Sequence, residues 1–202
     1  MNENNLKERI IIATLKELES VEVSEISLRK ISKQLNVTAQ APYHYFPNKD
    51  ALLLEIKIRA LSGLNSLWQN INDDETDSLR CLENLGISYA NYFYSNVGYY
   101  KVMKHKMKVG DDFKDEIKRA REMFIASAKD VVEENNIENL SPEHLTLLCW
   151  SSVHGLIDLH LQNMIAVNAM KSKDISITFL SEILAKTISA LVSSMTNRET
   201  DA

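Results

Sequence analysis

The sequence predicts an all-α protein with a small N-terminal helical domain and a larger helical bundle after it. Glycine and proline are scarce, with 5 and 3 in 202 residues, too few for the many tight turns of a β protein. Apolar residues recur at helical spacing along most of the chain. The prolines suit helix starts: in Ser141-Pro142-Glu143 the serine can cap, proline fits the first helical position, and glutamate meets the positive end of the helix dipole.

The apolar spacing predicts a succession of amphipathic helices joined by short polar loops. Asn48 is a suitable cap for the long segment that follows it, and the polar run 72–77 is expected to be a loop. The expected helices cover about 6–20, 28–35, 39–46, 48–71, 78–95, 98–107, 111–135, 142–169 and 174–195.

Charge is distributed unevenly along the chain. The net charge is −5, and residues 61–202 carry 14 Lys and Arg against 20 Asp and Glu. Residues 26–49 contain no acidic residue but hold Arg29, Lys30, Lys33 and Lys49. A basic patch on an acidic body is compatible with DNA binding, because attraction to phosphates acts over short distances at physiological salt. A chance gap in the acidic residues is the alternative.

Several classes of protein are not indicated by the composition. Cys81 and Cys149 stand alone, which suggests neither a disulfide framework nor a zinc site and favours a reducing cytoplasm. The N-terminus has no apolar signal segment, and no run of about 18 apolar residues suggests a membrane span. We therefore expect a cytoplasmic protein with no membrane partner, no cofactor and no metal.

Residues 26–49 predict two short helices joined by a tight turn. Ser27 can cap the first helix, and Asn36 tolerates the left-handed conformation that turns the chain. Val37 would fill the angle between the helices, and Thr38 would cap the second. Pro42 is compatible with that helix only near its first turn.

The second helix of this pair has a surface suited to a DNA major groove. Gln40, Ala41, Tyr43, His44 and Tyr45 are small, amphipathic or hydrogen-bonding, and none is acidic. Small side chains let a helix approach base edges, while hydroxyl and imidazole groups reach phosphates. The competing interpretation is a helical hairpin that only packs its aromatic residues.

This stretch resembles the DNA-binding domain of the TetR family of bacterial regulators. The family pattern is a short helix, a Gly or Asn turn, an apolar residue, a Ser/Thr cap, Tyr-x-His/Tyr-Phe, a proline, and a lysine before an apolar helix. The matching residues are Asn36, Val37, Thr38, Tyr43, Tyr45, Phe46, Pro47, Lys49 and Leu52. Asn36 replaces the more usual glycine, and Tyr45 replaces the more usual histidine.

The resemblance implies a role for each exposed residue of the pair. Arg29 would reach a base or a phosphate from the first helix, and Gln40 could pair with an adenine through both ends of its amide. The residues expected at phosphates are Thr38, Tyr43, Tyr45 and Lys49, and those expected near base edges are Ala39, Gln40, Ala41 and His44. With Ser27 and Arg29, these form the predicted DNA-binding set.

The resemblance also implies the function and the domain plan. Residues 1–50 would form a three-helix helix-turn-helix domain that binds double-stranded operator DNA. Residues 51–202 would form a helical domain for ligand binding and dimerisation, with the helices near 142–169 and 174–195 pairing two subunits. We expect a homodimeric repressor that reads an inverted repeat and is released by a small, mainly apolar effector.

A finer resemblance lies in Trp150-Ser-Ser-Val-His154-Gly155, which is similar to the Trp…His-Gly signature of one subgroup of TetR C-terminal domains. Trp150 and His154 share a helical face, and Gly155 would let another helix approach closely. The predicted effector-site residues are Tyr89, Phe93, Met103, Met107, Met123, Phe124, Trp150 and His154. Aromatic and Met side chains line adaptable apolar cavities, but they also fill cores.

Other functions find less support in the sequence. A helical enzyme would use His154 and Asp158 as an acid–base pair, but no nucleophile–base arrangement accompanies them. A metal site at His154, Asp158 and His160 is disfavoured because His160 points away from the helical face that the other two share. A DNA-binding regulator controlled by a protein partner, without a small molecule, stays open as an alternative.

Overall fold

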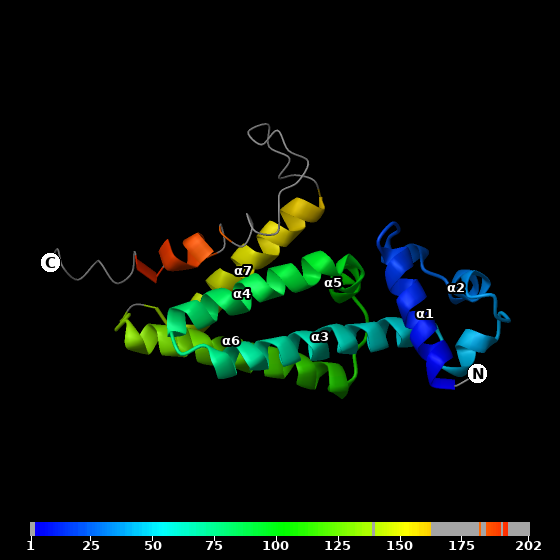
Figure 1. Cartoon of the computed structure of the whole chain (residues 1–202), viewed down its shortest axis with the longest axis horizontal. Helices are drawn as coiled ribbons and strands as arrows, with labels where there is room; N and C mark the ends of the chain where they lie inside the picture. The colour runs from blue at the N-terminus through cyan, green and yellow to red at the C-terminus, as the bar shows by residue number, and fades with distance from the viewer. Residues whose placement is uncertain (1–2, 139, 163–181, 183–184, 191, 194–202) are drawn as a thin grey trace. The chain divides into compact units, whose positions relative to one another are not determined.

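The computed structural model describes residues 3–138, 140–162, 182, 185–190 and 192–193 (Figure 1). None of these residues lies in a strand, which confirms the all-α prediction for the described part of the chain. No helix in these ranges is both long enough and apolar enough to cross a membrane. Residues 185–190 are helical, but most of the predicted helix 174–195, and the predicted end of 142–169, lie outside the described residues.

The chain forms two compact units. The first consists of residues 1–63 and 96–117, and the second of residues 64–95 and 118–202. The predicted domain boundary after residue 50 falls inside the first unit, near the start of a long helix.

The first unit contains α1 (Glu3–Leu18), a 3-10 turn η1 (Val23–Glu25), α2 (Leu28–Gln34), a second 3-10 turn η2 (Ala41–His44), the start of α3 (Lys49–Asp74), α5 (Val97–Lys104) and the first residues of α6 (Asp111–Glu134). Its core is built from apolar residues of α1, α2, α3 and α5, including Ile10, Ile31, Leu53 and Val102. Asn48 caps α3 as predicted, because its Oδ1 accepts the Ala51 N–H at 2.8 Å.

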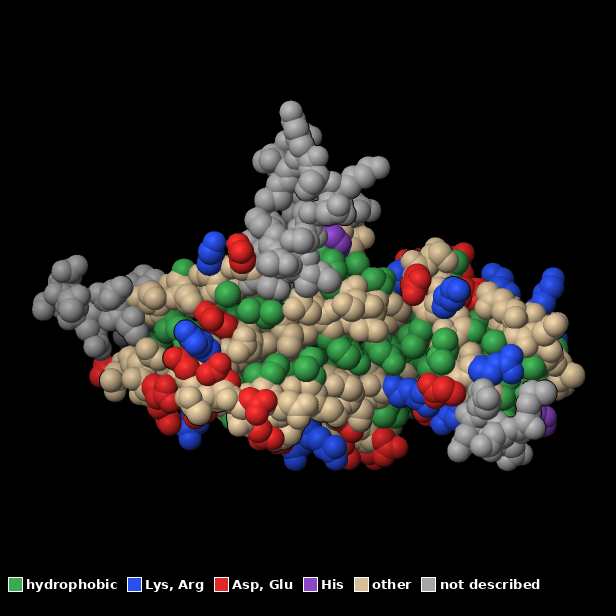
Figure 2. Space-filling model, in the orientation of Figure 1, with side chains coloured by type: hydrophobic (Ala, Val, Ile, Leu, Met, Phe, Trp, Pro, Cys, Tyr) green, Lys and Arg blue, Asp and Glu red, His purple; other side chains and the backbone are tan. Residues whose placement is uncertain are grey.

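The second unit contains the rest of α3 and α6, together with α4 (Ser78–Ser95) and α7 (Pro142–Leu161). Helix α4 packs against α7. The predicted start of α7 is confirmed: Pro142 takes the first helical turn, and Ser141 Oγ accepts the His144 N–H at 3.3 Å. The rings of Tyr89, Phe124 and Trp150 lie next to Trp68, which is fully buried. The outer face of α6 is charged, and Figure 2 shows acidic and basic side chains interspersed along it.

Helix α5 ends three residues before its predicted end at residue 107. His105 adopts an extended conformation (φ −67°, ψ 122°), so the backbone leaves the helix there. The carbonyls of Met103 and His105 accept hydrogen bonds from the Lys57 ammonium group, at 3.2 and 2.7 Å. Lys57 therefore satisfies carbonyls that a longer helix would have paired with its own N–H groups.

Candidate nucleic-acid interface and aromatic cluster

Helix α2 presents a basic outer face and an apolar inner face. Leu28 and Ile31 are buried, while Arg29, Lys30 and Lys33 are exposed, as the apolar spacing predicts. Ser27 occupies the predicted cap position with an extended backbone (φ −141°, ψ 127°), but its side chain makes no capping hydrogen bond. Its hydroxyl is therefore not committed to the helix start.

The turn after α2 is made by Asn36, as predicted. Asn36 is left-handed at φ 59°, a conformation that asparagine tolerates better than most residues. The Val37 N–H donates to Ser32 O at 3.0 Å and the Asn36 N–H to Lys33 O at 3.2 Å, the paired bonds of a Schellman motif. The local sequence therefore determines how the chain leaves α2.

The predicted second helix over 39–46 is wrong in extent, because only the 3-10 turn η2 forms. Pro42 lacks an N–H, and its ring would collide with the Thr38 carbonyl in an α-helix. The chain instead makes i to i−3 bonds from Ala41 to Thr38 at 3.1 Å and from Tyr43 to Gln40 at 3.0 Å. The predicted Thr38 cap is also wrong, since Gln40 takes the cap position and no side chain caps the turn.

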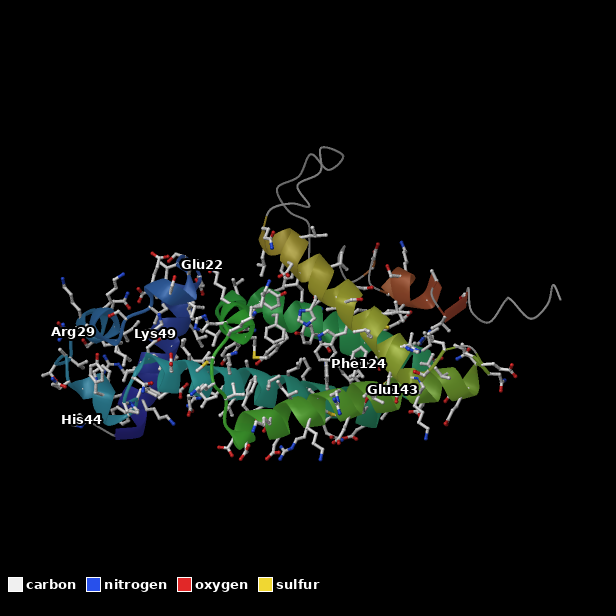
Figure 3. All side chains as sticks on the ribbon, turned by 180° about the vertical axis from the view of Figure 1, so that it is seen from behind. Glu22, Arg29, His44, Lys49, Phe124 and Glu143 are labelled. Carbon is white, nitrogen blue, oxygen red and sulfur yellow. The ribbon has the colours of Figure 1, made fainter. Side chains whose placement is uncertain are left out.

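The residues of this segment that were predicted to contact DNA differ in how exposed they are. Thr38, Ala39, Gln40 and His44 are exposed, and Tyr43 is 40% exposed. Ala41 is half-buried, and Tyr45 is half-buried against the core of the first unit. Figure 3 shows Arg29 and His44 at the outer edge of this unit, with Lys49 further in. The segment from α2 to η2 thus offers an acid-free surface with amide, hydroxyl, imidazole and guanidinium groups.

Lys49 has a structural role that the sequence did not indicate. Its Nζ donates to the Ser24 carbonyl at 2.9 Å and so joins the start of α3 to η1. An ammonium group has three donors, so the remaining two are available to a phosphate.

The two units carry opposite net charges. The first unit holds 14 Lys and Arg against 12 Asp and Glu, and the second holds 9 against 16. The predicted recognition surface therefore lies in the more positive unit.

An aromatic cluster fills the second unit. Tyr89 lies 4.7 Å from Phe93 and 5.6 Å from Trp150, and Phe124 lies 5.8 Å from Trp150, measured between ring centroids. Five predicted effector-site residues are thus brought together: Tyr89, Phe93, Phe124, Trp150 and His154. Phe124 lies among the helices of this unit in Figure 3.

Trp68 belongs to the same cluster, although sequence reasoning did not select it. Its ring lies 5.6 Å from Phe124 and 6.4 Å from Trp150. Its Nε1–H donates to Leu85 O at 3.1 Å and Ser88 Oγ at 3.0 Å. Trp68 lies four residues after Leu64 on the apolar face of α3, and this spacing could have shown from the sequence that Trp68 is buried.

One polar pair lies within the aromatic cluster. Tyr89 Oη and His154 Nε2 are 2.9 Å apart, and the His154 ring stacks on Trp150 at 5.7 Å with an interplanar angle of 17°. Burial, helped by the negative charge of Asp158, raises the pKa of Tyr89 well above its ordinary value. Tyr89 therefore keeps a protonated hydroxyl, which lies within hydrogen-bond distance of His154.

The cluster is closely packed. It encloses a cavity of about 10 Å³, lined by Trp68, Gly86, Tyr89, Phe124, Trp150, Val153 and His154. This is about the room that one water molecule needs. A larger molecule can enter only if these side chains move apart.

The predicted Met residues do not join this cavity. Met103 and Met107 belong to the first unit, where Met107 packs against the core. Met123 is half-buried on α6 and does not line the cavity. The physical reason for Met103 and Met107 is that residues 96–117 pack in the first unit, whereas the cavity lies in the second.

His154 and His160, two residues of the disfavoured metal site, contact different partners. His160 lies against Tyr94, with ring centroids 4.2 Å apart, and burial lowers its pKa. His154 instead bonds to Tyr89. Among the described residues, no three His, Cys, Asp or Glu side chains are grouped so that they could hold a metal ion.

The fold and the exposed α2–η2 segment define a helix-turn-helix DNA-binding regulator. Residues 10–56 match the family described as "Bacterial regulatory proteins, tetR family". Residues 82–182 match the "Tetracyclin repressor-like, C-terminal domain". The chain therefore belongs to the TetR family, whose members are transcriptional regulators and not enzymes. The Trp…His-Gly subgroup stays a prediction.

Solved structures share this fold at low sequence identity. A TetR family transcriptional regulator, PfmR from Thermus thermophilus, is 18% identical, with a TM-score of 0.72 over 92% of this chain and 97% of that one. FadR from Bacillus subtilis, solved in complex with stearoyl-CoA, is 12% identical, with a TM-score of 0.68 over 89% and 96%. A protein of unknown function from Rhodococcus sp. RHA1 is 14% identical, with a TM-score of 0.76 over 95% and 96%. No curated protein matches the sequence.

Proposed function

We propose that this regulator is a cytoplasmic homodimeric repressor that binds an inverted-repeat operator and is released by a small, mainly apolar effector. The observation that carries the DNA-binding part is the exposed, acid-free segment from Arg29 to His44. Thr38, Gln40 and His44 are exposed on it. Such groups can read base edges and hold phosphates.

The first test is selection of binding sites from a random duplex library. We expect an inverted repeat, with affinity that falls steeply as salt rises. Gln40→Ala should change base preference at one or two positions in each half-site, by about 1–3 kcal/mol. Gln69→Ala is the matched control, because Gln69 is an exposed glutamine of the second unit.

No selected sequence, or binding that ignores salt, would contradict the proposal. A Gln40→Ala variant with unchanged base preference would show that Gln40 does not read a base, and that the neighbouring residues determine the operator sequence.

The exposed face of α7 supports the homodimer. Leu147 is 66% exposed, Leu148 38% and Leu159 43%. Gly155 has no described atom within 4 Å of the position that a Cβ would take, so the predicted close helix approach is not made within the described chain. A second subunit packed on this face would cover the three leucines and use the space at Gly155. Sedimentation should give twice the chain mass.

The aromatic cluster supports the effector site. Its walls are apolar, and the hydrogen bond between Tyr89 and His154 places one polar pair in the cavity lining. FadR from Bacillus subtilis, which shares the fold, holds stearoyl-CoA, so a long apolar molecule is a reasonable probe. An effector would have to move the aromatic rings apart. It changes operator affinity only as far as it binds the DNA-bound and the released conformations of the protein with different affinities.

Tryptophan fluorescence tests the effector site directly, because the chain has two tryptophans and both belong to the cluster. Long-chain acyl-CoA, free fatty acids and neutral aromatic compounds would be titrated against the protein–operator complex. We expect the same compound to release DNA and shift the fluorescence over one concentration range. A compound that releases DNA with unchanged fluorescence would place the effector site elsewhere.

The small cavity also favours a second candidate, a regulator controlled by a protein partner. A cavity of about 10 Å³ holds no effector, so a cluster that never opens would not serve as an effector site. Operator binding that responds to none of the compounds would favour this candidate.

A further inference from the structure

Tyr89 and His154 form a hydrogen-bonded pair that joins two helices. Tyr89 lies on α4 and His154 on α7, and the two helices pack against each other, as Figure 1 shows. Tyr89 Oη and His154 Nε2 are 2.9 Å apart, and both side chains line the cavity of the aromatic cluster. This bond between α4 and α7 therefore lies at the cavity in which the effector is proposed to bind.

The chemistry of Tyr89 decides the direction of this hydrogen bond. Tyr89 is buried and keeps its proton, because burial raises its pKa. Among the described residues, His154 Nε2 is the one hydrogen-bond partner of this hydroxyl. A buried donor without an acceptor is costly, so the hydroxyl donates and Nε2 accepts. Opening the pair therefore exposes one donor, the Tyr89 O–H, and one acceptor, His154 Nε2.

A hydroxyl is the polar group that satisfies both members of the opened pair. Its oxygen accepts the proton of Tyr89 and donates its own proton to His154 Nε2. A carbonyl or an ether oxygen only accepts, so it leaves Nε2 without a donor. An ammonium group only donates, so it leaves the Tyr89 proton without an acceptor. The pair therefore favours a hydroxyl over these groups.

Charge disfavours an anionic group at the same position. Asp158 lies one helical turn after His154 on α7, and its negative charge, second to burial, raises the pKa of Tyr89. The described lysines and arginines of the second unit are all exposed: Arg80, Lys118, Arg119, Arg121, Lys129 and Lys186. Within the described part of this unit, a carboxylate beside Tyr89 would face a like charge and no buried cation. Burying a charge without a partner is costly.

The size of the cavity also fits a small neutral group. A cavity of about 10 Å³ has room for one water-sized group. A hydroxyl bonded to both side chains would hold Tyr89 Oη and His154 Nε2 about 4.5 Å apart, because each bond spans about 2.8 Å and the two meet at a bent oxygen. Their present separation is 2.9 Å. Binding would therefore move side chains of α4 and α7 apart while the apolar body of the ligand displaces the rings.

We infer that the effector is an apolar compound with one neutral hydroxyl, an alcohol or a phenol, which inserts between Tyr89 and His154. This inference rests on the proposed effector site in the aromatic cluster. The inserted hydroxyl replaces one hydrogen bond by two and separates α4 from α7 at this point. Because α7 also carries the proposed dimer face, this movement would alter the packing of the two subunits and so the spacing of their DNA-binding segments.

The test compares isomers in which the oxygen carries either a proton or a methyl group. The phenol pair is para-pentylphenol and para-butylanisole, and the alcohol pair is decanol and nonyl methyl ether. Para-pentylbenzoate supplies an anion and phenylpentylammonium a cation. Each compound is titrated against the full chain, with tryptophan fluorescence as the measure of binding and release of the selected operator as the second measurement.

We expect the wild type to bind the hydroxyl compound of at least one pair about ten- to a hundredfold more tightly than its ether isomer, because the ether leaves Nε2 unsatisfied. The pair that shows the preference tells whether the body of the effector is aromatic or aliphatic. His154→Phe keeps a ring beside Trp150 but removes Nε2, so the preference should disappear. The matched control is His160→Phe. His160 also lies on α7, but it lies against Tyr94 and does not line the cavity, so the preference should stay.

Equal binding of the hydroxyl compounds and their ethers, or a response only to anions or only to the cation, would overturn the inference and leave the proposed effector site intact. A His154→Phe protein that keeps the wild-type preference would also overturn it, because the hydroxyl would then donate elsewhere. The comparison of isomers on the wild type decides the inference even where a variant does not fold. If none of these compounds, nor acyl-CoA or fatty acids, changes the fluorescence or the operator affinity, the proposed effector site is refuted and the inference with it.

Discussion

Gly98 is where the packing of the first unit can be tested most directly. A Cβ at Gly98 would lie 2.9 Å from the Leu15 carbonyl oxygen and 3.2 Å from Leu15 Cδ2, where α5 packs on α1. The first contact is closer than Cβ atoms come in real structures, and it involves backbone that cannot rotate away. Gly98→Ala therefore forces α1 and α5 apart or strains both.

Two opposing effects decide the size of the change. Alanine is better than glycine within a helix by about 0.5–1 kcal/mol. Overpacking a closed contact costs about 1–3 kcal/mol. The clash is the larger effect, so we expect Gly98→Ala to lower the free energy of unfolding by about 1–2 kcal/mol.

Urea denaturation at fixed protein concentration measures this change. With a slope of about 2 kcal/mol per molar urea, the midpoint should fall by about 0.5–1 M. Gly110→Ala is the control: no atom of the described residues lies within 4 Å of its Cβ position and its φ is not positive, so its midpoint should stay near that of the wild type. A Gly98→Ala protein as stable as the wild type would refute the assigned packing of α5 on α1.

Three further changes test the second unit. Trp68→Phe should lower the free energy of unfolding by about 1–3 kcal/mol in urea titration, because the smaller ring leaves a cavity and the two hydrogen bonds donated by Trp68 Nε1 are lost; an unchanged midpoint would contradict this packing of Trp68. Burial raises the pKa of Cys149 to about 12, so above the ordinary value of 9.0 the unfolded state loses its proton first and stability should fall as pH rises. Cys149 contributes up to about 1.4 kcal/mol per pH unit to that fall, so the fall should be shallower in Cys149→Ala, and equal slopes in both proteins would exclude the buried thiol. Gly155→Ala should stabilise a monomer by about 0.5–1 kcal/mol but weaken a dimer packed on α7, so sedimentation showing an unaffected dimer would remove Gly155 from the interface.

Local sequence determined much of this protein. The cap at Asn48, the start of α7 at Ser141 and Pro142, and the left-handed turn at Asn36 were all predicted, because each depends on the preferences of a few adjacent residues. The all-α fold was likewise predicted from local spacing, and the family pattern in residues 26–49 is itself a feature of the local sequence. The apolar spacing likewise predicted the bounds of α4, Ser78–Ser95.

Only the tertiary structure decided how distant residues meet. The sequence selected Tyr89, Phe124, Trp150 and His154 but could not show that Trp68 lies among them, or that together they leave a cavity of about 10 Å³. It also could not show that Lys57 binds two carbonyls at the end of α5, 46 and 48 residues away in the sequence. The physical reason is that helical periodicity shows which face of a segment is buried, whereas its partners, and the space left between them, depend on how several helices pack together.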